Sequence, residues 1–339
     1  MTPGLRVGVV GAGLRGRMYA RVLRRVAGVE VIGLCDPSAR VAREAEAELG
    51  LSVMAAHPEL LARDLDAVVV ATPDFAHAEP AVDAAAAGCH LMVEKPLAMS
   101  VEDAQAIADA VDASGRECLV AFENRWNPAF SQLRERIGAG ELGRVVFQSA
   151  VLNTTRFVPT GMLGWAARTS PLWFQMAHTL DLVTWLAGSP VASVAAVGSR
   201  GALADEGVDT WDVVQALVTL EDGSTASLES SWVLPESMPS FADFRFEVVG
   251  ERGAAFVDQL DQTLRVAGER LTFPRTLALE VAGRPEGFPA WMATQWAEDL
   301  LAERPLRPGV EDGLASTRAL CAIEESLETG APVSLGAAR

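Results

Sequence analysis

The first third of the chain alternates between short apolar runs and segments rich in helix-forming residues, and this alternation restricts the fold more than any other feature. The apolar runs cover residues 5–10, 29–36, 66–72, 90–94 and 117–122. The helical segments between them cover residues 14–26, 38–49, 76–87 and 98–113. Several runs are apolar at successive positions, as expected of strands with helices on both faces. The pattern predicts an α/β fold with a doubly wound parallel sheet and right-handed crossovers.

The first predicted turn carries the sequence GAGLRG, in which Gly11, Gly13 and Gly16 match the G-x-G-x-x-G motif. The motif follows a predicted strand and opens a predicted helix, which is the context that dinucleotide binding requires. Gly11 allows the tight turn, Gly13 lets a pyrophosphate approach the backbone, and Gly16 lets the helix pack on the strand. The sequence predicts a Rossmann-type site with cofactor contacts from Gly11, Gly13, Leu14, Arg15, Gly16, Asp36, Thr72, Pro73, His77, Glu94 and Lys95.

Asp36 ends the second predicted strand, 20 residues after Gly16, where an acidic side chain binds the ribose 2′-hydroxyl. A carboxylate about 4 Å from a 2′-phosphate opposes it by roughly 4 kcal/mol at an effective dielectric constant of about 20. NAD is therefore favoured over NADP. Ser38 and Arg40 follow closely, and Arg40 could bind a 2′-phosphate if Asp36 turned away, so NADP stays open as the second possibility.

The pattern changes after residue 122, so we expect an NAD(P)-binding domain at 1–122 and a substrate-binding and oligomerisation domain at 123–339. Asp222 and Gly223 form a turn signal between two alternating runs, which is typical of a β-hairpin. The alternation predicts a large open sheet, antiparallel or mixed, with one exposed face. Such a face suits a homo-oligomer, either dimer or tetramer. Helices are expected at 127–143, 171–187, 288–302 and 311–329.

Composition excludes several classes of partner. Half of the 339 residues are hydrophobic and the net charge is −17, which argues against nucleic acid because no basic surface for phosphates is visible. The cysteines lack metal-ligand spacing, so we expect a reduced compartment and no metal site. No basic leader or long apolar run is visible, so we expect a cytoplasmic protein that does not bind membranes.

Lys95 is the only lysine among the 28 Lys and Arg residues, and it lies between Glu94 and Pro96 just beyond the strand predicted at 90–94. In an open α/β sheet, ligands bind beyond the carboxyl ends of the strands. A lysine can exchange a proton, whereas an arginine stays charged at any useful pH. We interpret Lys95 as a proton donor or acceptor; the alternative is a surviving surface lysine without a role.

The histidines are His57, His77, His90 and His178. His178 is the only imidazole of the predicted second domain, on the helix predicted at 171–187, with Phe174 one turn before it. It is a candidate for the site, although a hydrogen-bonded core histidine is an equal alternative. His57 and His90 are interpreted as structural, whereas His77 either contacts the nicotinamide or is structural.

Three stretches together resemble the glucose–fructose oxidoreductase / inositol dehydrogenase (Gfo/Idh/MocA) family: GAGLRG, ATPDFAHAEPAVDAAAAGCHLMVEKPLA and the later H-x-x-D…WLAG pattern. The resemblance implies an N-terminal Rossmann domain and a C-terminal α/β domain whose open sheet mediates oligomerisation. It also implies NAD(P)-linked oxidation or reduction of a small-molecule sugar, inositol or related polyol. By the same resemblance, Lys95 and His178 are the catalytic residues that bind the reacting hydroxyl and move its proton.

The chain departs from that family at Phe174, because well-studied members carry an aspartate four residues before the histidine. A phenyl ring cannot accept a hydrogen bond from a substrate hydroxyl. Either Lys95 and His178 suffice, with polar contacts from Gln175 or Asp181, or the substrate presents an apolar part to Phe174. The expected substrate-binding residues are Lys95, Arg125, Trp126, Trp165, Phe174, Gln175 and His178, with Arg156, Phe157, Arg168 and Trp173 as further candidates. The aromatic candidates are either pocket or core residues, and Arg125, Arg156 and Arg168 could instead bind a carboxylate or phosphate on the substrate.

The leading hypothesis is an NAD(P)-dependent oxidoreductase that transfers a hydride between nicotinamide and a secondary alcohol or ketone. The alternative from another class is a nucleotide-sensing regulator or binding protein that has lost turnover, and Phe174 is the reason to consider it. A third hypothesis is an enzyme that holds NAD tightly and uses transient oxidation for elimination or epimerisation.

Overall fold

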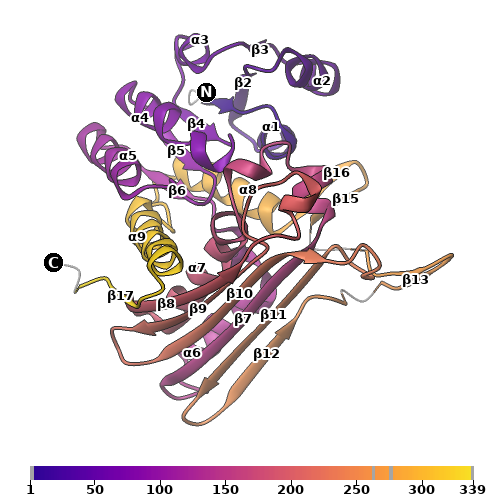
Figure 1. The fold of residues 1–339 in the computed structure, drawn as a ribbon. Helices are drawn as coiled ribbons and strands as arrows, with labels where there is room; N and C mark the ends of the chain where they lie inside the picture. Colours follow the sequence, from indigo (N-terminus) through magenta and orange to yellow (C-terminus); the bar gives the residue numbers. More distant parts are fainter. Residues whose placement is uncertain (1–3, 262–263, 275–277, 337–339) are drawn as a thin grey trace. The chain divides into compact units, whose positions relative to one another are not determined.

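The computed structural model describes residues 4–261, 264–274 and 278–336, and the chain forms two compact units (Figure 1). The first unit contains Met1–Trp126 and Ala278–Thr317, and the second contains Asn127–Leu277 and Arg318–Arg339. The division predicted at residue 122 assigns 278–317 to the second domain, whereas this segment is part of the first unit. The chain therefore returns to the first unit after most of the second is complete.

The first unit contains a six-stranded sheet in the order β3-β2-β1-β4-β5-β6, in which all neighbours run parallel. This confirms the predicted doubly wound parallel sheet. Strand β3 has two residues and was not predicted; the other five strands were. The strands are β1 (Leu5–Val10), β2 (Val29–Cys35), β3 (Val53–Met54), β4 (Ala67–Val70), β5 (His90–Val93) and β6 (Cys118–Val120).

Helices cover both faces of this sheet, so successive strand residues enter two different cores. Val68 and Val70 of β4 lie in one core, and Ala67 and Val69 lie in the other. The continuous apolar runs follow from this double burial. The helices are α1 (Leu14–Leu23), α2 (Ala39–Leu49), α3 (His57–Leu61), α4 (Ala78–Ala86), α5 (Val101–Ser114), α8 (Phe288–Leu301) and the first part of α9 (Val310–Thr329), with η1 (Asp74–Ala76), η2 (Glu123–Trp126) and the hairpin β15 (Ala278–Val281) and β16 (Arg284–Gly287).

The second unit contains a seven-stranded mixed sheet in the order β12-β11-β7-β10-β9-β8-β17, with β10 parallel to β7 and the other neighbours antiparallel. The predicted hairpin is confirmed: Gly223, with a φ of 83°, lies in the turn between β9 and β10. The strands are β7 (Val145–Thr155), β8 (Val191–Ser199), β9 (Val213–Leu220), β10 (Thr225–Leu234), β11 (Ala242–Gly250), β12 (Ala254–Asp258) and β17 (Val333–Ser334), with a separate pair β13 (Val266–Ala267) and β14 (Leu271–Thr272).

The two faces of this mixed sheet differ in burial. In β10, Ala226 and Leu228 are buried, whereas Thr225 and Ser227 on the opposite face are exposed. Helix α7 packs on β7 and β10. The sheet therefore has one helix-covered face and one open face, as the alternation predicts. The helical segments are α6 (Pro128–Gly138), α7 (Ala177–Ala187), η3 (Val158–Met162), η4 (Ala166–Arg168), η5 (Leu172–Met176), η6 (Ala204–Glu206) and the last part of α9.

The helix predicted at 171–187 is present, but its first turn is π-helical. Segment η5 is one π-helical turn, and regular α-helix begins only at Ala177 in α7. The wider spacing of a π-helix changes which residues share a face, so α-helical spacing does not carry over to Phe174. The predicted stop at Gly188, with a φ of 70°, is confirmed. Within the described ranges, every helix is too short or too polar to span a bilayer.

Candidate active site

The glycine loop connects β1 to α1 and leaves one part of its backbone open. Gly11 has a φ of 95°, and a Cβ there would lie 2.4 Å from the carbonyl oxygen of Ala71. A Cβ at Gly16 would lie 1.8 Å from the carbonyl oxygen of Gly11, but one at Gly13 would meet nothing within 4 Å. The next side chain, Leu14, is 72% exposed. The open backbone at the start of α1 fits a pyrophosphate, which favours unpaired helix N–H groups.

Asp36 is tied to the glycine loop. Its Oδ2 accepts a hydrogen bond from the Ala12 N–H at 3.0 Å, and its Oδ1 accepts one from the Ser38 N–H at 2.8 Å. A carboxylate has about four acceptor sites, so the group keeps capacity for a ribose hydroxyl. Arg40 pairs with Glu44 at 2.6 Å. This arrangement fits NAD, because Asp36 is fixed toward the loop while Arg40 is engaged elsewhere.

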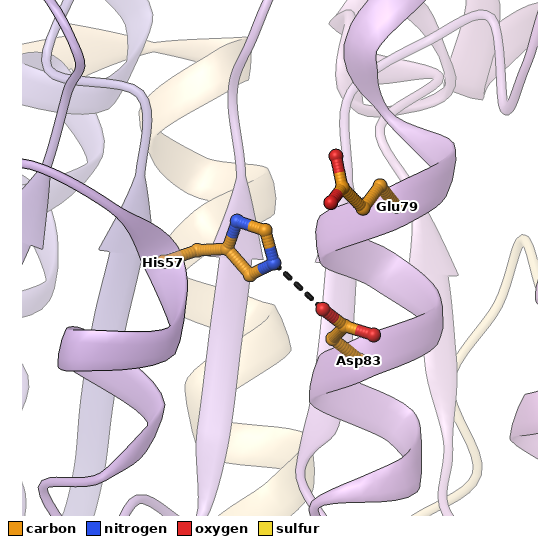
Figure 2. A group of neighbouring side chains, drawn as sticks. All are labelled: His57, Glu79 and Asp83. Carbon is orange, nitrogen blue, oxygen red and sulfur yellow. Dashed lines mark hydrogen bonds and ion pairs between the residues drawn. The ribbon is translucent and has the colours of Figure 1, made fainter.

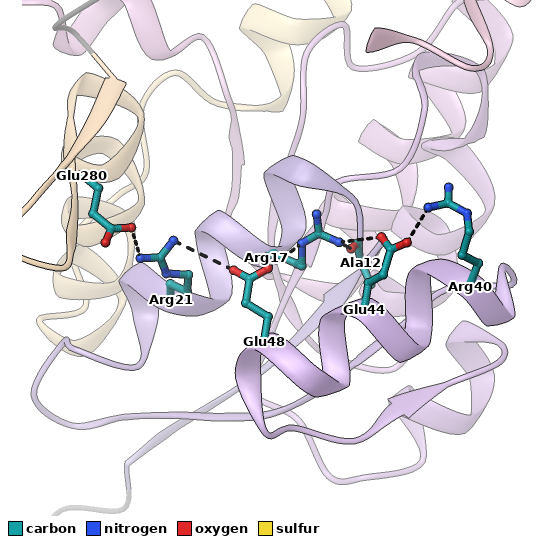
Figure 3. A network of polar contacts seen from close by, with 7 residues as sticks. All are labelled: Ala12, Arg17, Arg21, Arg40, Glu44, Glu48 and Glu280. Atoms are coloured by element: carbon teal, nitrogen blue, oxygen red, sulfur yellow. Dashed lines mark hydrogen bonds and ion pairs between the residues drawn. The ribbon is translucent and has the colours of Figure 1, made fainter. Parts of the chain in front are cut away.

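A chain of ion pairs links α1 to α2 beside this loop (Figure 3). The Arg17 Nη1 lies 3.5 Å from the carbonyl oxygen of Ala12, and its Nε lies 3.0 Å from Glu48. Arg21 pairs with both Glu48 and Glu280. Exposed pairs of this kind contribute about 0–1 kcal/mol each, so they add little to the stability of the unit.

Lys95 lies directly after β5, at the carboxyl end of the strand, as the sequence predicts. Its backbone N–H donates to Oε2 of Glu94 at 3.2 Å, and Oε1 of Glu94 accepts a hydrogen bond from the Tyr19 hydroxyl at 2.6 Å. The Lys95 side chain is buried, with 5% of the residue exposed. Its neighbour Glu94 is thus anchored to α1, the helix that follows the glycine loop.

His77 joins the loop after β4 to the turn at Lys95. Its Nδ1 lies 2.7 Å from the carbonyl oxygen of Pro96, and its Nε2 lies 3.0 Å from that of Thr72. The Lys95–Pro96 peptide bond is cis. Both ring nitrogens contact the backbone and His77 is 1% exposed. This geometry supports the structural interpretation of His77, next to Thr72 and Pro73 in the same loop.

Arg125 and Trp126 lie in η2 and are held within the first unit. The Arg125 Nη2 donates to Asp312 of α9 at 3.0 Å, and its guanidinium lies 5.8 Å from the ring centroid of Phe122. The Trp126 Nε1 donates to Gln295 of α8 at 2.8 Å. Both residues fall within the substrate domain predicted at 123–339, whereas the structure groups them with the first unit.

In the second unit, Phe174 lies in a row of three aromatic rings. Its ring contacts Trp165 and Trp232 edge to face, with centroid separations of 6.0 Å in both cases. Phe174 and Trp165 are partly exposed, whereas Trp232 is fully buried. Edge-to-face packing fixes ring orientation and contributes about 0.5–1.5 kcal/mol per pair. Trp165 and Phe174, predicted separately, are therefore brought together.

His178 is the second residue of α7 and is half-buried. Gln175, in η5, is only 2% exposed, and neither its Nε2 nor its Oε1 has a hydrogen-bond partner among the described residues. The neighbouring Trp173 is a core residue whose Nε1 donates to Glu324 at 3.0 Å. Burial raises the pKa of the Glu324 carboxyl, and the hydrogen bond from Trp173 opposes this.

His57 belongs to a group of possible metal ligands at the surface of the first unit (Figure 2). Its Nε2 lies 2.7 Å from Oδ2 of Asp83, and Glu79 precedes Asp83 by one turn on α4. The ion pair connects α3 to α4. This role agrees with the interpretation of His57 as a structural residue.

Two family models match the chain. Residues 5–122 match the oxidoreductase family with an NAD-binding Rossmann fold, and residues 130–256 match the GFO/IDH/MocA C-terminal domain. The chain belongs to the Gfo/Idh/MocA family. It is an NAD-binding oxidoreductase, and NAD is its cofactor, as the sequence predicts.

Relatives and a solved structure agree with this assignment. Myo-inositol dehydrogenase Hyg17 of Streptomyces leeuwenhoekii is 33% identical over 255 residues, covering 74% of this chain and 75% of that protein. The scyllo-inositol 2-dehydrogenase (NAD(+)) of Bacillus subtilis strain 168 is 28% identical over 263 residues, covering 76% and 74%. The scyllo-inositol dehydrogenase from Lactobacillus casei with bound NAD(H) and scyllo-inositol has a TM-score of 0.83 over 98% of this chain and 99% of that one, at 18% identity. At this identity the structural likeness shows the fold alone.

Sequence reasoning missed two residues beside Glu94 and Lys95. Glu123 follows the strand predicted at 117–122, so the rule that sites form beyond strand ends could have found it. Tyr19 carried no such signal, because its partner Glu94 is 75 residues away in the chain.

Proposed function

We propose that this chain transfers a hydride between NAD and a CH–OH carbon of a cyclic polyol or sugar, with Lys95 and His178 moving the hydroxyl proton. The observation that carries the proposal is Lys95, the only lysine of the chain, which is buried beyond β5 in an NAD-binding oxidoreductase. A group that must exchange a proton cannot be replaced by arginine, which stays charged.

The glycine loop and Asp36 are proposed to hold the cofactor. The open backbone at Gly13 would receive the pyrophosphate, and the free acceptor capacity of Asp36 would bind the adenosine ribose. When bound, NAD supplies the hydride acceptor at the nicotinamide. Leu14 and the loop at Thr72 and Pro73 would border the same ligand.

The amine of Lys95 would accept the hydroxyl proton during oxidation of the alcohol, and its ammonium would return the proton during reduction. Proton transfer by one positioned side chain contributes a factor of about 10²–10⁴. Because Lys95 is buried, exchange with bulk water would not compete with this transfer.

His178 is proposed as the second group that contacts the same hydroxyl. Its half-buried position at the start of α7 leaves part of the imidazole accessible. Two residues that act on one proton give strongly non-additive effects when both are removed. The double variant Lys95→Met with His178→Ala should therefore lose little more activity than Lys95→Met alone. Fully multiplicative losses would contradict a shared role.

Phe174 bears on the class of substrate. Named relatives are inositol dehydrogenases, which supports a cyclic polyol. The partly exposed Phe174 ring, packed against Trp165 and Trp232, offers carbon surface and no hydrogen-bond acceptor. We therefore propose a ring substrate that presents an apolar edge to Phe174 in addition to the reacting hydroxyl.

The open face of the mixed sheet is proposed to bind a second copy of the chain. One row across the sheet contains two large apolar side chains, Leu217 at 65% and Phe256 at 71% exposure, with Ser227, Ser149 and Glu247 between them. Apolar side chains on a flat exposed face are typical of interaction sites. Sedimentation should give a species larger than the 35.9 kDa monomer, and Leu217→Asp should shift it toward monomer. A monomeric wild type at micromolar concentration would overturn this part.

The function is tested by incubating the protein with NAD and a panel of inositols, sugars and their deoxy or O-methyl derivatives while NADH is recorded. Accumulation of NADH with at least one ring alcohol supports the proposal. Tight NAD binding with no turnover across the panel would favour the nucleotide-sensing alternative. Conversion of substrate without NADH release would favour transient oxidation by a held cofactor.

A further inference from the structure

A buried link joins α1, the helix that follows the glycine loop, to the turn that carries Lys95. Tyr19 of α1 donates its hydroxyl to Oε1 of Glu94 at 2.6 Å, and the backbone N–H of Lys95 donates to Oε2 of the same carboxylate at 3.2 Å. Tyr19 is 0% exposed and Glu94 is 7% exposed. One buried carboxylate therefore connects a helix side chain to the backbone of the residue that is proposed to move the proton.

The link depends on a carboxylate at Glu94. Both oxygens of an ionised carboxylate accept hydrogen bonds, whereas a side-chain amide accepts only at its one oxygen. The Nε of Arg15, one turn before Tyr19 on α1, lies 3.5 Å from Oε1 of Glu94 and supplies a positive charge for the buried group. This separation is longer than a usual N–H···O hydrogen bond, so the closer contact with Oε1 is that of Tyr19. Both contacts with Oε1 come from α1.

Tyr19 is enclosed in the protein and does not reach a ligand. Its side chain belongs to the buried core that includes Val9 of β1 and Met92 of β5. Burial raises the pKa of the Tyr19 phenol, and the charge of Glu94 raises it further, so the hydroxyl stays protonated and remains a donor. An effect of this hydroxyl on hydride transfer would therefore pass through Glu94, the group to which it donates.

We propose that Tyr19 and Glu94 are positioning residues, which hold the backbone at Lys95 in a fixed place relative to α1. The cofactor pyrophosphate is proposed to bind at the start of the same helix, so the link would fix the amine of Lys95 relative to the bound NAD. This inference deepens the proposed function and rests on it, because it takes Lys95 as the proton-moving group. Glu94, predicted from the sequence as a cofactor contact, thereby gains a second task.

Loss of the Tyr19 hydroxyl should affect the chemical step more than cofactor binding. Without this donor, Oε1 of Glu94 loses its closer contact, and the carboxylate is held less firmly against the Lys95 N–H. A catalytic group that is displaced by about 1 Å can lose about 10²-fold in rate. The glycine loop and Asp36 are proposed to hold NAD at its other end, so NAD affinity should change little.

The single lysine makes a direct test possible. Full-length protein is labelled with ¹⁵N-lysine, so that the only labelled backbone amide is that of Lys95, and its NMR signal is recorded without cofactor or substrate. Single-turnover hydride transfer, with myo-inositol or another ring alcohol that gives NADH, and NAD affinity are measured on the same proteins. Tyr19→Phe removes the hydroxyl and keeps the ring. Thr317→Val is the matched control, because Thr317 is also 0% exposed in the first unit but its hydroxyl donates to the carbonyl oxygen of Ala98 at 3.4 Å.

Tyr19→Phe is expected to slow hydride transfer about 10- to 100-fold and to leave NAD affinity nearly unchanged. It should also move the Lys95 amide proton to a lower chemical shift, as a weaker hydrogen bond does. Thr317→Val should keep the rate and the Lys95 signal of wild type, although it also loses a buried hydrogen bond. If Tyr19→Phe does not fold, Glu94→Gln takes its place, since one amide oxygen cannot accept from both Tyr19 and the Lys95 N–H, and the Lys95 signal should again move.

A wild-type Lys95 signal in the folded variant, or a wild-type rate of hydride transfer in Tyr19→Phe, would overturn the inference. Equal losses of rate in Tyr19→Phe and Thr317→Val would also overturn it, because they would indicate a general loss of packing. The proposed function fails separately, through undiminished hydride transfer in Lys95→Arg or through absence of NADH with every ring alcohol. The Lys95 amide signal is recorded without ligand, so it tests the link from α1 in either case.

Discussion

The surroundings of Lys95 in the first unit and of His178 in the second unit are built from opposite kinds of residue. Around Lys95, carboxylates, an arginine and a phenol are connected by short contacts in which each group has a partner, such as Tyr19 to Glu94. In the segment just before His178, the ring of Phe174 packs edge to face with Trp165 and Trp232, and the buried amide of Gln175 has no partner among the described residues.

The difference separates two tasks. A network of ion pairs and hydrogen bonds fixes charge and geometry before any substrate arrives, as proton transfer requires. The aromatic surface and the unpaired amide of the second unit instead leave contacts that a bound ligand could complete. Under the proposed function, the first unit would carry the chemical step and the second unit would carry the recognition that differs between substrates.

Among the variants considered, replacement of Lys95 should have the largest effect on activity. Lys95→Arg keeps the positive charge, so a purely electrostatic role predicts nearly normal activity, whereas a proton-transfer role predicts a loss of about 10²–10⁴ in the hydride-transfer step. NAD affinity should change little, since the glycine loop and Asp36 hold the other end of the cofactor. Single-turnover hydride transfer and a separate NAD titration measure the two quantities. Equal single-turnover rates would show that the lysine is not the proton-moving group.

Replacement of Phe174 tests whether this ring of the second unit contacts the substrate, and it should change the preference among substrates. Phe174→Asp adds an acceptor for a substrate hydroxyl, and a hydrogen bond to a charged group contributes about 1.5–3 kcal/mol. The ratio of kcat/KM for a fully hydroxylated ring over its deoxy analogue should rise about 10- to 100-fold. The conservative control is Phe174→Leu, which keeps the apolar surface and should preserve the ratio. A folded Phe174→Asp protein with an unchanged profile would place this ring outside the substrate site.

Local sequence patterns predicted the surroundings of Lys95 better than the aromatic segment before His178. The glycine loop and Lys95 were found because each depends on a short motif at a strand end, and the hairpin at Asp222 and Gly223 was found for the same reason. The π-helical turn at 172–176, which packs on β7 and β10, was missed, because an apolar pattern that indicates a helix does not distinguish a π-helical turn from an α-helical one.

Long-range contacts account for the other omissions. Arg15, near the start of the first unit, pairs with Glu123, in the last segment of that unit before the second unit begins. The spacing of residues along the chain does not predict a contact between positions so far apart. The same applies to 278–317, whose helix α8 packs with α1 although most of the second unit lies between them in the sequence. Strand β3 and helix α3 are too short for a reliable periodic signal.

Replacing Asp36 tests the cofactor end of the first unit, with a smaller effect. Asp36→Ala removes the acceptor for the ribose and the repulsion of a 2′-phosphate, so NAD should bind at least about tenfold more weakly, as expected for loss of a hydrogen bond to a charged group. Preference against NADP should relax at the same time. Calorimetric titration with both dinucleotides measures this. Unchanged affinity for both would mean that the acid after β2 does not touch the cofactor.

Replacing Gln175 gives the smallest expected effect and the most specific one for the second unit. A buried polar group without a partner costs about 1–3 kcal/mol, so Gln175→Met, which keeps the size and removes the amide, should raise the free energy of unfolding of the substrate-free protein by about that amount. Gln148 is the matched control, because it is equally buried and its Nε2 donates to the carbonyl oxygen of Val183 at 3.0 Å, so that of its two polar atoms only Oε1 has no partner among the described residues. Gln148→Met should therefore destabilise the protein.

If the Gln175 amide serves the substrate, KM should rise in Gln175→Met while kcat changes little, since the loss is one of binding. Denaturant unfolding measures the stability of both variants, and steady-state kinetics measures KM and kcat. If Gln175→Met destabilises the protein as much as Gln148→Met does, the Gln175 amide already has its partners in the substrate-free protein. The segment before His178 would then resemble the surroundings of Lys95.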